Sequence, residues 1–500
     1  MINVNKKNKV KNKTFEFLTI FSMTFGIVVG SGIYLKNSGD NGVLARANDN
    51  PWVAMAVWVF VGIFACMMMF TFLEASSAAK KDDYNSMGVL GAQFLGRKWG
   101  SLFSIFFIVI YTPLLTIIGA LFTINSLFSA IDAFMLASGK GLSEAIGGND
   151  VRIVVELILG AVTLVTFQAI NSIYKDSGKW IQIIFSILKF VPLIIVIGGG
   201  ITLYATGNVE NNTFTNQGGF KFNSIFACLI PILFAFDGFL DSINIQHDIE
   251  HKKVVSPAML TGVISVAVFY LIVTVSIFLV SPNGNVLTMF DKASPGFSLA
   301  FNLIITLTLL TTINAYTTLY PKIVQASYDE KYLYKRSFDE KIKWKNATWI
   351  SVIITDVVIV TFVTTSLLID STDYFLVADY SADTGILYAF TVYALIMYGV
   401  IRNRKTKKVE VKEMKNTHVL NIITLVILVF MIGYMHYISI IDSIIVYAKE
   451  GDPSNLVVPV MWFGFAIIMG FAFLINENLM LSWKLKQLTS KPDQKLAKVK

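Results

Sequence analysis

Long apolar runs separated by shorter polar segments follow one another along the whole 500-residue chain. Each run has about 20 residues, enough for a helix to cross the roughly 30 Å hydrocarbon core of a bilayer. The runs lack the alternation of apolar and polar residues that barrel strands need. We therefore predict an all-α integral membrane protein with 12 transmembrane helices. Their expected centres are Phe25, Val61, Ile110, Ile158, Val191, Phe234, Tyr270, Leu309, Val360, Phe390, Ile427 and Gly470.

The composition supports a membrane protein. Hydrophobic residues make up 55% of the chain and charged residues only 15%, against roughly a quarter in soluble domains. The net charge of +8 would elsewhere favour nucleic-acid binding. Here the basic residues gather in the connections between spans and no aromatic-basic module accompanies them, so we expect no nucleic-acid partner.

The lysines before the first span predict the orientation of the chain in the membrane. The first apolar run is too long for the core of a signal peptide and lacks a small-residue cleavage site, so we interpret it as a span. Cytoplasmic connections retain Lys and Arg, and most of the 41 basic residues fall on cytoplasmic segments if the N-terminus is cytoplasmic. We therefore expect a multi-pass protein of the plasma membrane with both termini in the cytoplasm.

Few residues suggest catalysis or metal binding. Cys66 and Cys228 lie in predicted spans without CxxC spacing, which indicates packing. The four histidines do not cluster at ligand spacing, so no metal site is expected. No P-loop, GxSxG, HExxH or dinucleotide fingerprint is present. We expect no catalytic residues, no cofactor and no ATP-driven step.

The stretch GIVVGSGIY, from Gly26 to Tyr34, interrupts the first predicted helix. In a bilayer, non-helical backbone is tolerated only where protein or a water-filled cavity satisfies its polar groups. The stretch therefore indicates a broken helix whose freed backbone binds something. Alternatively, Gly30 and Gly32 let another helix approach closely.

A second interruption lies five spans later, in ACLIPILFAFDGFLDSINIQHDIE. This sixth span has Pro231 near its start and the pair Asp237-Gly238 at its middle. An ionisable residue at that depth costs several kcal/mol and usually faces a cavity or a partner. Two interrupted helices in corresponding places of two five-span units are typical of an inverted-repeat transporter.

This pattern predicts five segments. They are a basic tail (1–14), a first five-helix repeat (15–205), a second, inverted five-helix repeat (206–402), two additional helices (403–483) and a basic tail (484–500).

Several motifs, in order, resemble the amino acid–polyamine–organocation (APC) superfamily of permeases. They are GSGIY, WVFVGIFACMMMFTFLEASSA ending near Glu74, ILKFVPLII, FAFDGF, DIEHKKVVSPAM and INAYTTLYPKIVQASYDE. The similarity covers about the first ten spans and weakens after Lys345. It implies a LeuT-like fold, with a 5+5 inverted repeat and broken helices one and six, and transport of amino acids.

The resemblance also implies a substrate site at the first break. Backbone amides around Gly30, Ser31 and Gly32, at the positive end of the second half-helix, suit the carboxylate of an amino acid. Glycine lets the backbone approach that carboxylate closely.

The ammonium of the substrate would bind the carbonyls freed near Val28 and near Phe234 and Asp237. Phe234 matches the aromatic residue that covers the substrate in the family; the alternative is an ordinary packed phenylalanine. Asp237 departs from many relatives, which carry an apolar or small polar residue there. It would select a cationic side chain such as that of arginine, lysine or ornithine, or hold the α-ammonium, or pair inside the protein without meeting substrate.

Lys189 is interpreted as the one lysine inside a span, facing the interior of the bundle. In proton-linked members of the resembled family, a lysine in this helix occupies the place of a sodium ion. A buried ammonium gives up its proton more easily because water no longer stabilises the charge. This favours proton coupling over sodium coupling; a static salt bridge with Asp237 or Asp241 is the alternative.

We thus expect a secondary transporter of amino acids that is proton-coupled and favours cationic substrates. An exchanger of amino acids, or of an amino acid for a polyamine, is the alternative, and a channel or a membrane-embedded enzyme are remote ones. The expected partners are the amino acid, a proton and membrane lipid. The sequence assigns no role to Asp356, Asp379 or Asp383 and no oligomeric state.

Overall fold

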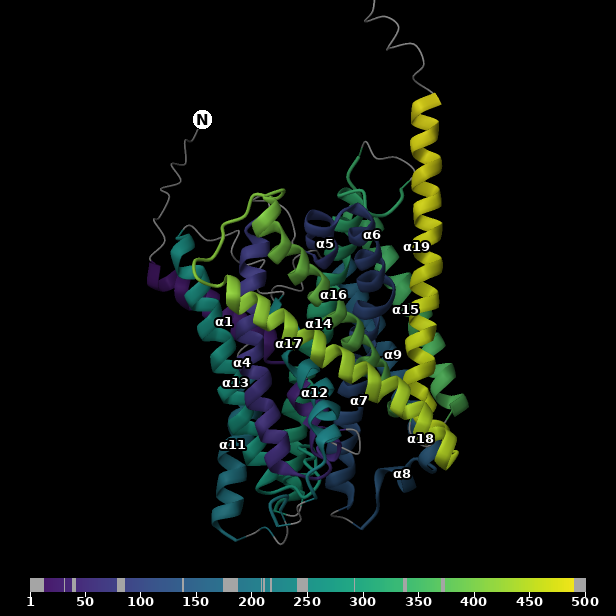
Figure 1. Ribbon diagram of the computed structural model, residues 1–500. Coiled ribbons are helices and arrows are strands. Elements are labelled where there is room, and N and C mark those ends of the chain that lie inside the picture. The colour runs from purple at the N-terminus through teal and green to yellow at the C-terminus, as the bar shows by residue number, and fades with distance from the viewer. Residues whose placement is uncertain are drawn as a thin grey trace, which may run out of the picture.

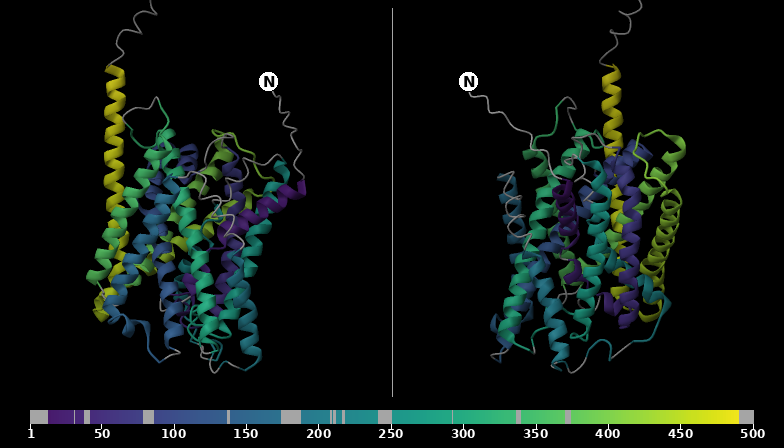
Figure 2. Two further views of the ribbon diagram at one scale, coloured as in Figure 1. Left: turned by 180° about the vertical axis from the view of Figure 1, so that it is seen from behind. Right: turned by 90° about the vertical axis from the view of Figure 1, so that its left-hand side faces the viewer.

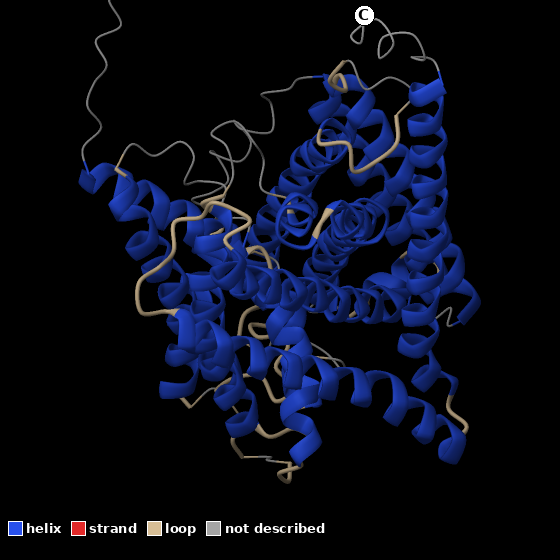
Figure 3. Ribbon diagram, turned by 45° about the horizontal axis from the view of Figure 1, so that its top comes forward, coloured by secondary structure: helices blue, strands red, loops and turns tan. Residues whose placement is uncertain are grey.

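Helices and their connecting loops make up all of the chain that the computed structural model describes, with no strand among those residues (Figure 3). The described residues are 13–30, 32–37, 42–78, 86–136, 139–173, 188–207, 209, 212–215, 218–240, 251–291, 293–335, 340–369 and 374–489. The expectation of an all-α protein is confirmed for this part of the chain.

The helices follow the apolar runs in order. They are α1 (Lys13–Val28), α2 (Gly32–Asn37), α3 (Val43–Arg46), α4 (Pro51–Ser76), α5 (Met87–Leu95), α6 (Arg97–Ile105), the π-helix η1 (Phe106–Tyr111), α7 (Thr112–Leu136), α8 (Leu142–Ala145), α9 (Asn149–Ile173), α11 (Phe190–Ala205), α12 (Phe222–Phe236), the 3-10 helix η3 (Lys252–Val254), α13 (Val255–Phe278), α14 (Pro295–Asp329), α15 (Trp344–Ile369), α16 (Tyr374–Thr406), α17 (His418–His436), the π-helix η4 (Tyr437–Asp442), α18 (Ser443–Glu450), the 3-10 helix η5 (Pro453–Leu456) and α19 (Val457–Thr489).

Polar residues at the ends of the apolar runs fix where helices begin. The Asn50 side chain accepts hydrogen bonds from the backbone amides of Trp52 and Val53 at the start of α4, and Pro51 occupies the first helical position. Ser294 and Pro295 begin α14 in the same way. The first backbone amides of a helix have no partner within it. The Asn or Ser side chain accepts hydrogen bonds from some of them, and Pro has no amide hydrogen to satisfy.

The helices form one bundle in which α7 and α14 pack against each other along much of their length (Figure 1). α4 and α1 pack on α13, while α17 crosses the bundle obliquely against α16 and α4. The first turn of α1 and the last turns of α19 lie toward the same end of the bundle (Figures 1 and 2). We call this the terminal end and the opposite one the far end.

Nine helices in the described part of the chain are long and apolar enough to cross a bilayer, and α11 and α12 are shorter apolar helices. Large apolar side chains on α9, α15, α17 and α19 are exposed, as expected of surfaces that face lipid. Each predicted span centre falls within one of the helices above. The count of 12 spans and the inverted repeat remain predictions.

Candidate functional site

The first predicted helix is interrupted where the glycines occur. α1 ends at Val28 and α2 begins at Gly32. The Tyr270 hydroxyl, from α13, donates to the Val28 carbonyl at 2.9 Å and accepts from the Gly30 amide. Ser31, expected to bind the substrate carboxylate, lies outside the described residues. A buried tyrosine thus satisfies part of the backbone that the break releases.

Gly32 lies directly against α12. A Cβ atom there would come within 2.6 Å of the Cα atom of Ala235, whereas one at Gly30 would meet only the Val28 carbonyl oxygen, at 3.8 Å. The absence of a side chain at Gly32 therefore lets α2 and α12 approach each other, as the second interpretation of the motif predicts.

Gly32→Ala should lower the melting temperature of the purified protein and reduce transport, because the new methyl group must displace the backbone of α12. Overpacking of this kind costs about 1–3 kcal/mol. Gly30→Ala is the matched control and should leave the melting temperature almost unchanged, since its Cβ has space. Equal melting temperatures for the two variants would show that α2 and α12 separate easily.

Asp237 lies at the second interruption, directly after α12 ends at Phe236. The next residue, Gly238, has φ +93°, a conformation that glycine adopts without a Cβ clash. The Asp237 carboxylate accepts hydrogen bonds from the hydroxyls of Tyr111 (2.6 Å) and Tyr393 (3.2 Å) and from the Gly238 amide. In the described part of the chain it makes no ion pair, so an internal partner for its charge is not seen there.

Asp237 lines a cavity of about 40 Å³ together with the two tyrosines. Residues of α5, η1, α7, α14 and α16 form most of its wall. Its lining is Ser86, Met87, Phe107, Tyr111, Thr112, Leu115, Asp237, Gly238, Leu240, Tyr316, Leu319, Ile323 and Tyr393. The carboxylate therefore faces a space large enough for a few water molecules.

A π-helix brings Tyr111 to this cavity. The segment η1 joins α6 and α7 and ends at Tyr111. π-Helical turns disturb the regular ladder of helical hydrogen bonds and are frequent at functional sites. The Tyr320 hydroxyl from α14 donates to the Ile108 carbonyl within η1 and so helps to hold the segment in place.

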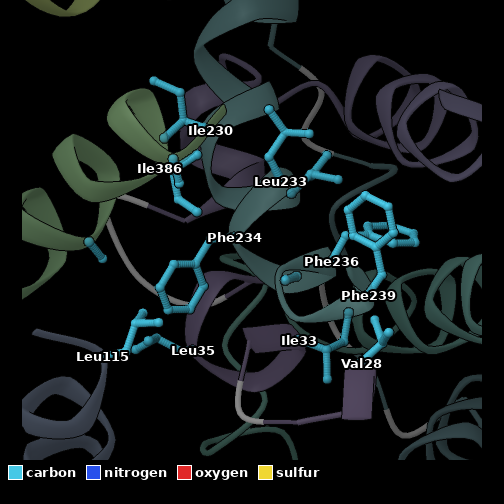
Figure 4. Close-up of a cluster of buried hydrophobic side chains, with 14 of the residues drawn as sticks. Val28, Ile33, Leu35, Leu115, Ile230, Leu233, Phe234, Phe236, Phe239 and Ile386 are labelled. Carbon is cyan, nitrogen blue, oxygen red and sulfur yellow. The ribbon is translucent and has the colours of Figure 1, made fainter. Parts of the chain in front are cut away.

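Phe234 projects from the side of α12 opposite Phe236 and Phe239, toward Leu115 and Leu35 (Figure 4). Its ring is buried, and the Lys36 ammonium lies 5.0 Å from the ring centroid. Such a contact is attractive because the face of an aromatic ring carries a partial negative charge. Phe234 thus packs against one member of a group of buried charges.

That group is a charge network of four residues, Lys36, Arg46, Asp379 and Asp383. The Lys36 ammonium binds both carboxylates, with its Nζ atom 3.0 Å from Oδ1 of Asp383, and Arg46 binds the other oxygen of Asp383. Lys36 is 1% exposed and Asp383 also 1%. Two cations and two carboxylates balance, which is the condition for burying charge.

The network joins α2 and α3 to the first half of α16. The expectation that Lys189 is the one lysine inside a span stays a prediction; a further lysine, Lys36, is buried in α2. The shared face of Asp379 and Asp383, four residues apart, is the feature that binds Lys36.

Lys189 directly precedes α11, and its side chain is 7% exposed. Within the described residues its ammonium makes no ion pair, and the Asp237 carboxylate binds tyrosines instead. The other suggested partner, Asp241, lies outside the described residues. The structure therefore provides no salt bridge between Lys189 and Asp237.

Helix-by-helix reasoning missed Tyr111, Tyr393 and Lys36. The local sequence around Tyr111 and Tyr393 does not distinguish them from other aromatic residues of membrane helices, and only folding brings them to Asp237. Lys36 carried a signal, since it follows GSGIY by two residues within an apolar segment.

This bundle of interrupted and uninterrupted apolar helices is that of a multi-pass membrane protein. The sequence model of the amino acid permease family matches residues 15–473. The chain belongs to that family.

Two curated relatives are similar over about half of their length. A serine/threonine exchanger of Bacillus subtilis is 23% identical over 283 residues, which cover 56% of this chain and 58% of the relative. An uncharacterized protein of Mycoplasma pneumoniae is 23% identical over 316 residues, covering 57% and 53% respectively.

Among solved structures, the Eremococcus coleocola manganese transporter in complex with an aromatic bis-isothiourea compound has a similar fold. Its TM-score is 0.53 at 12% identity, over 93% of this chain and 96% of that one. At this identity the likeness concerns the fold alone.

Proposed function

We propose that this protein is a secondary transporter that carries amino acids across the plasma membrane and favours those with a cationic side chain. The observation that carries the proposal is the Asp237 carboxylate, which lines a cavity at the break that follows α12 and has no cation partner among the described residues. Membership of the amino acid permease family supports the substrate class.

The hydrogen bonds to Asp237 explain how it would select a cation. Two tyrosine hydroxyls and one amide donate hydrogen bonds to the carboxylate and orient it at the cavity. A guanidinium or ammonium entering the cavity would supply the missing positive charge through a charge-assisted hydrogen bond. A neutral side chain would leave that charge unpaired, which is the basis of discrimination.

The two ends of the bundle support alternating access. The cavity of Asp237 lies against α5, η1, α7 and α14, while the charge network joins α2 and α3 to α16. In alternating access, this cavity would be reached from one side of the membrane in the present conformation. Separation of α2 from α16, breaking the contacts of Lys36, would open the far end.

Uptake into proteoliposomes tests the proposed function. The purified protein would be given labelled arginine, lysine, ornithine, serine and threonine, with and without the same amino acid inside. Saturable uptake led by the cationic amino acids supports the proposal, and an absence of uptake of every amino acid contradicts it. An ohmic current would indicate a channel.

An exchanger is the second candidate, because the Bacillus subtilis relative is named a serine/threonine exchanger. Uptake only into vesicles already loaded with an amino acid would favour exchange. Preference for serine and threonine would favour a substrate class like the one in that relative's name.

The proposed coupling ion is a proton carried by Lys189. We expect uptake to follow a pH gradient and to be indifferent to replacing sodium by choline. Lys189→Ala should remove the pH dependence of uptake, because no titrating ammonium remains, while exchange of amino acids survives.

Lys189→Arg is the matched variant. The guanidinium keeps a buried positive charge but cannot give up its proton, so proton-coupled uptake should also be lost. An unchanged pH profile in Lys189→Ala would reduce Lys189 to a structural residue.

A further inference from the structure

Polar side chains from α7, α9, α14 and α15 meet at a second cavity that shares no lining residue with the cavity of Asp237. We call it the hydroxyl site. It is lined by Thr116, Gln168, Thr317, Tyr320, Thr348, Ser351, Val352 and Thr355. Its volume is about 10 Å³, which is room for one species of the size of a water molecule.

The hydroxyl groups at this site already donate their hydrogens in hydrogen bonds within the protein. Each donates to a backbone carbonyl: Thr116 to Thr112 (2.7 Å), Thr317 to Ile313 (2.9 Å), Thr348 to Trp344 (2.9 Å), Ser351 to Thr348 (2.7 Å), Thr355 to Ser351 (2.7 Å) and Tyr320 to Ile108. A hydroxyl has one hydrogen and two lone pairs. What these residues can still offer the cavity is therefore oxygen lone pairs, although one lone pair of Thr317 already accepts from the Asn171 amide (2.7 Å).

Gln168 adds a further acceptor to the wall of the site, and Asp356, which does not line the cavity, is the hydrogen-bond partner of Gln168. The Gln168 side chain is 6% exposed and donates a hydrogen bond to the Asp356 carboxyl group. Oε1 of Gln168 and Oδ1 of Asp356 are buried and have no hydrogen-bond partner in the described part of the chain. Buried polar atoms without a partner are costly, so each calls for a ligand or a function.

A site of acceptors suits a cation better than water. A water molecule could donate two hydrogens, but its own lone pairs would face the lone pairs of the lining. A hard cation uses every oxygen as a ligand and exchanges its hydration shell for them. The acidic group beside the site is Asp356, which reaches it through its hydrogen bond with Gln168, and the small volume excludes a hydrated ion.

We propose that the hydroxyl site binds one dehydrated sodium ion. The ion would join α15 and α9 to the central pair α7 and α14 and stabilise this part of the bundle. Because none of these four helices contains the breaks at Gly30 or Asp237, the ion would remain in place while substrate is carried. The proposal is independent of proton coupling at Lys189.

Melting temperature tests the site on the purified full-length protein, without substrate or gradients. It would be measured in detergent in increasing sodium chloride, with choline chloride keeping the ionic strength constant. A ligand that binds the folded state raises stability with the logarithm of its concentration. We expect a saturating rise of roughly 2–5 °C in sodium over choline.

Thr355→Val and Ser351→Ala should remove this difference between salts, whatever they do to the melting temperature itself. Thr361→Val is the matched control, because Thr361 is an exposed threonine of α15 that donates to its own helix in the same way; it should keep the difference. Equal melting temperatures of the wild type in sodium and choline would overturn the proposal. So would a sodium effect that survives in Thr355→Val and Ser351→Ala, or one that is lost in Thr361→Val.

Discussion

Lys36→Met should abolish transport and destabilise the protein by several kcal/mol. The substitution leaves Asp379 and Asp383 with Arg46 as the remaining cation of the charge network, so one negative charge is buried without compensation. Removing one partner of a buried ion pair costs about 3–5 kcal/mol. Melting temperature of the purified protein and uptake by proteoliposomes would measure the two effects.

A double-mutant cycle separates loss of charge balance from loss of packing. Lys36→Met with Asp379→Asn removes one charge of each sign and should be more stable than Lys36→Met alone, with a coupling energy in the range of about 0.5–3 kcal/mol. Lys407→Met, which breaks the exposed pair with Glu413, is the control and should change stability little. If the stability effects of Lys36→Met and Asp379→Asn simply add, the proposed energetic coupling between these two charges is contradicted.

Cys228 offers a native reporter of opening at the far end. Its thiol is fully buried in α12 and lies within electrostatic range of the Arg46 guanidinium. In a Cys66→Ala background, the wild-type network should protect Cys228 from a membrane-impermeant maleimide added on the far side, and Lys36→Met should increase the labelling rate. Unchanged labelling would mean that the network stabilises the fold without closing the site.

Asp237→Asn should weaken uptake of arginine or lysine by much more than uptake of any neutral amino acid. The amide keeps the size of the side chain but loses the charge that a cationic substrate would neutralise. A hydrogen bond to a charged group contributes about 1.5–3 kcal/mol, so kcat/KM for the cationic substrates should fall roughly ten- to a hundredfold. Initial uptake rates over a range of substrate concentrations measure the change.

Tyr393→Phe is the matched variant for this prediction. It removes the longer of the two hydroxyl contacts, at 3.2 Å, and keeps the carboxylate, so it should affect cationic and neutral substrates to a similar, smaller extent. Equal loss for all substrates in Asp237→Asn would favour contact with the α-ammonium or a structural role. Transport of neutral amino acids alone by the wild type would end the cationic hypothesis.

The sequence by itself determined where the helices lie and where two of them are interrupted. Burial in lipid requires each span to be a continuous apolar run, so the runs are visible without knowledge of their neighbours. The breaks could also be predicted from nearby residues, because α1 ends within the glycine motif and α12 ends next to Asp237-Gly238. The family could also be predicted, because its motifs are short stretches in a fixed order.

Only the tertiary structure decided which polar groups meet. The Lys36 side chain finds Asp379 and Asp383 more than 340 positions along the chain, and Asp237 finds Tyr111 and Tyr393 from two other helices. A membrane helix shows its own apolar pattern but carries no mark of the residue that will face it. The pairing of buried charges and hydroxyls follows from helix packing, because each must be satisfied by whatever partner the bundle brings within hydrogen-bond distance.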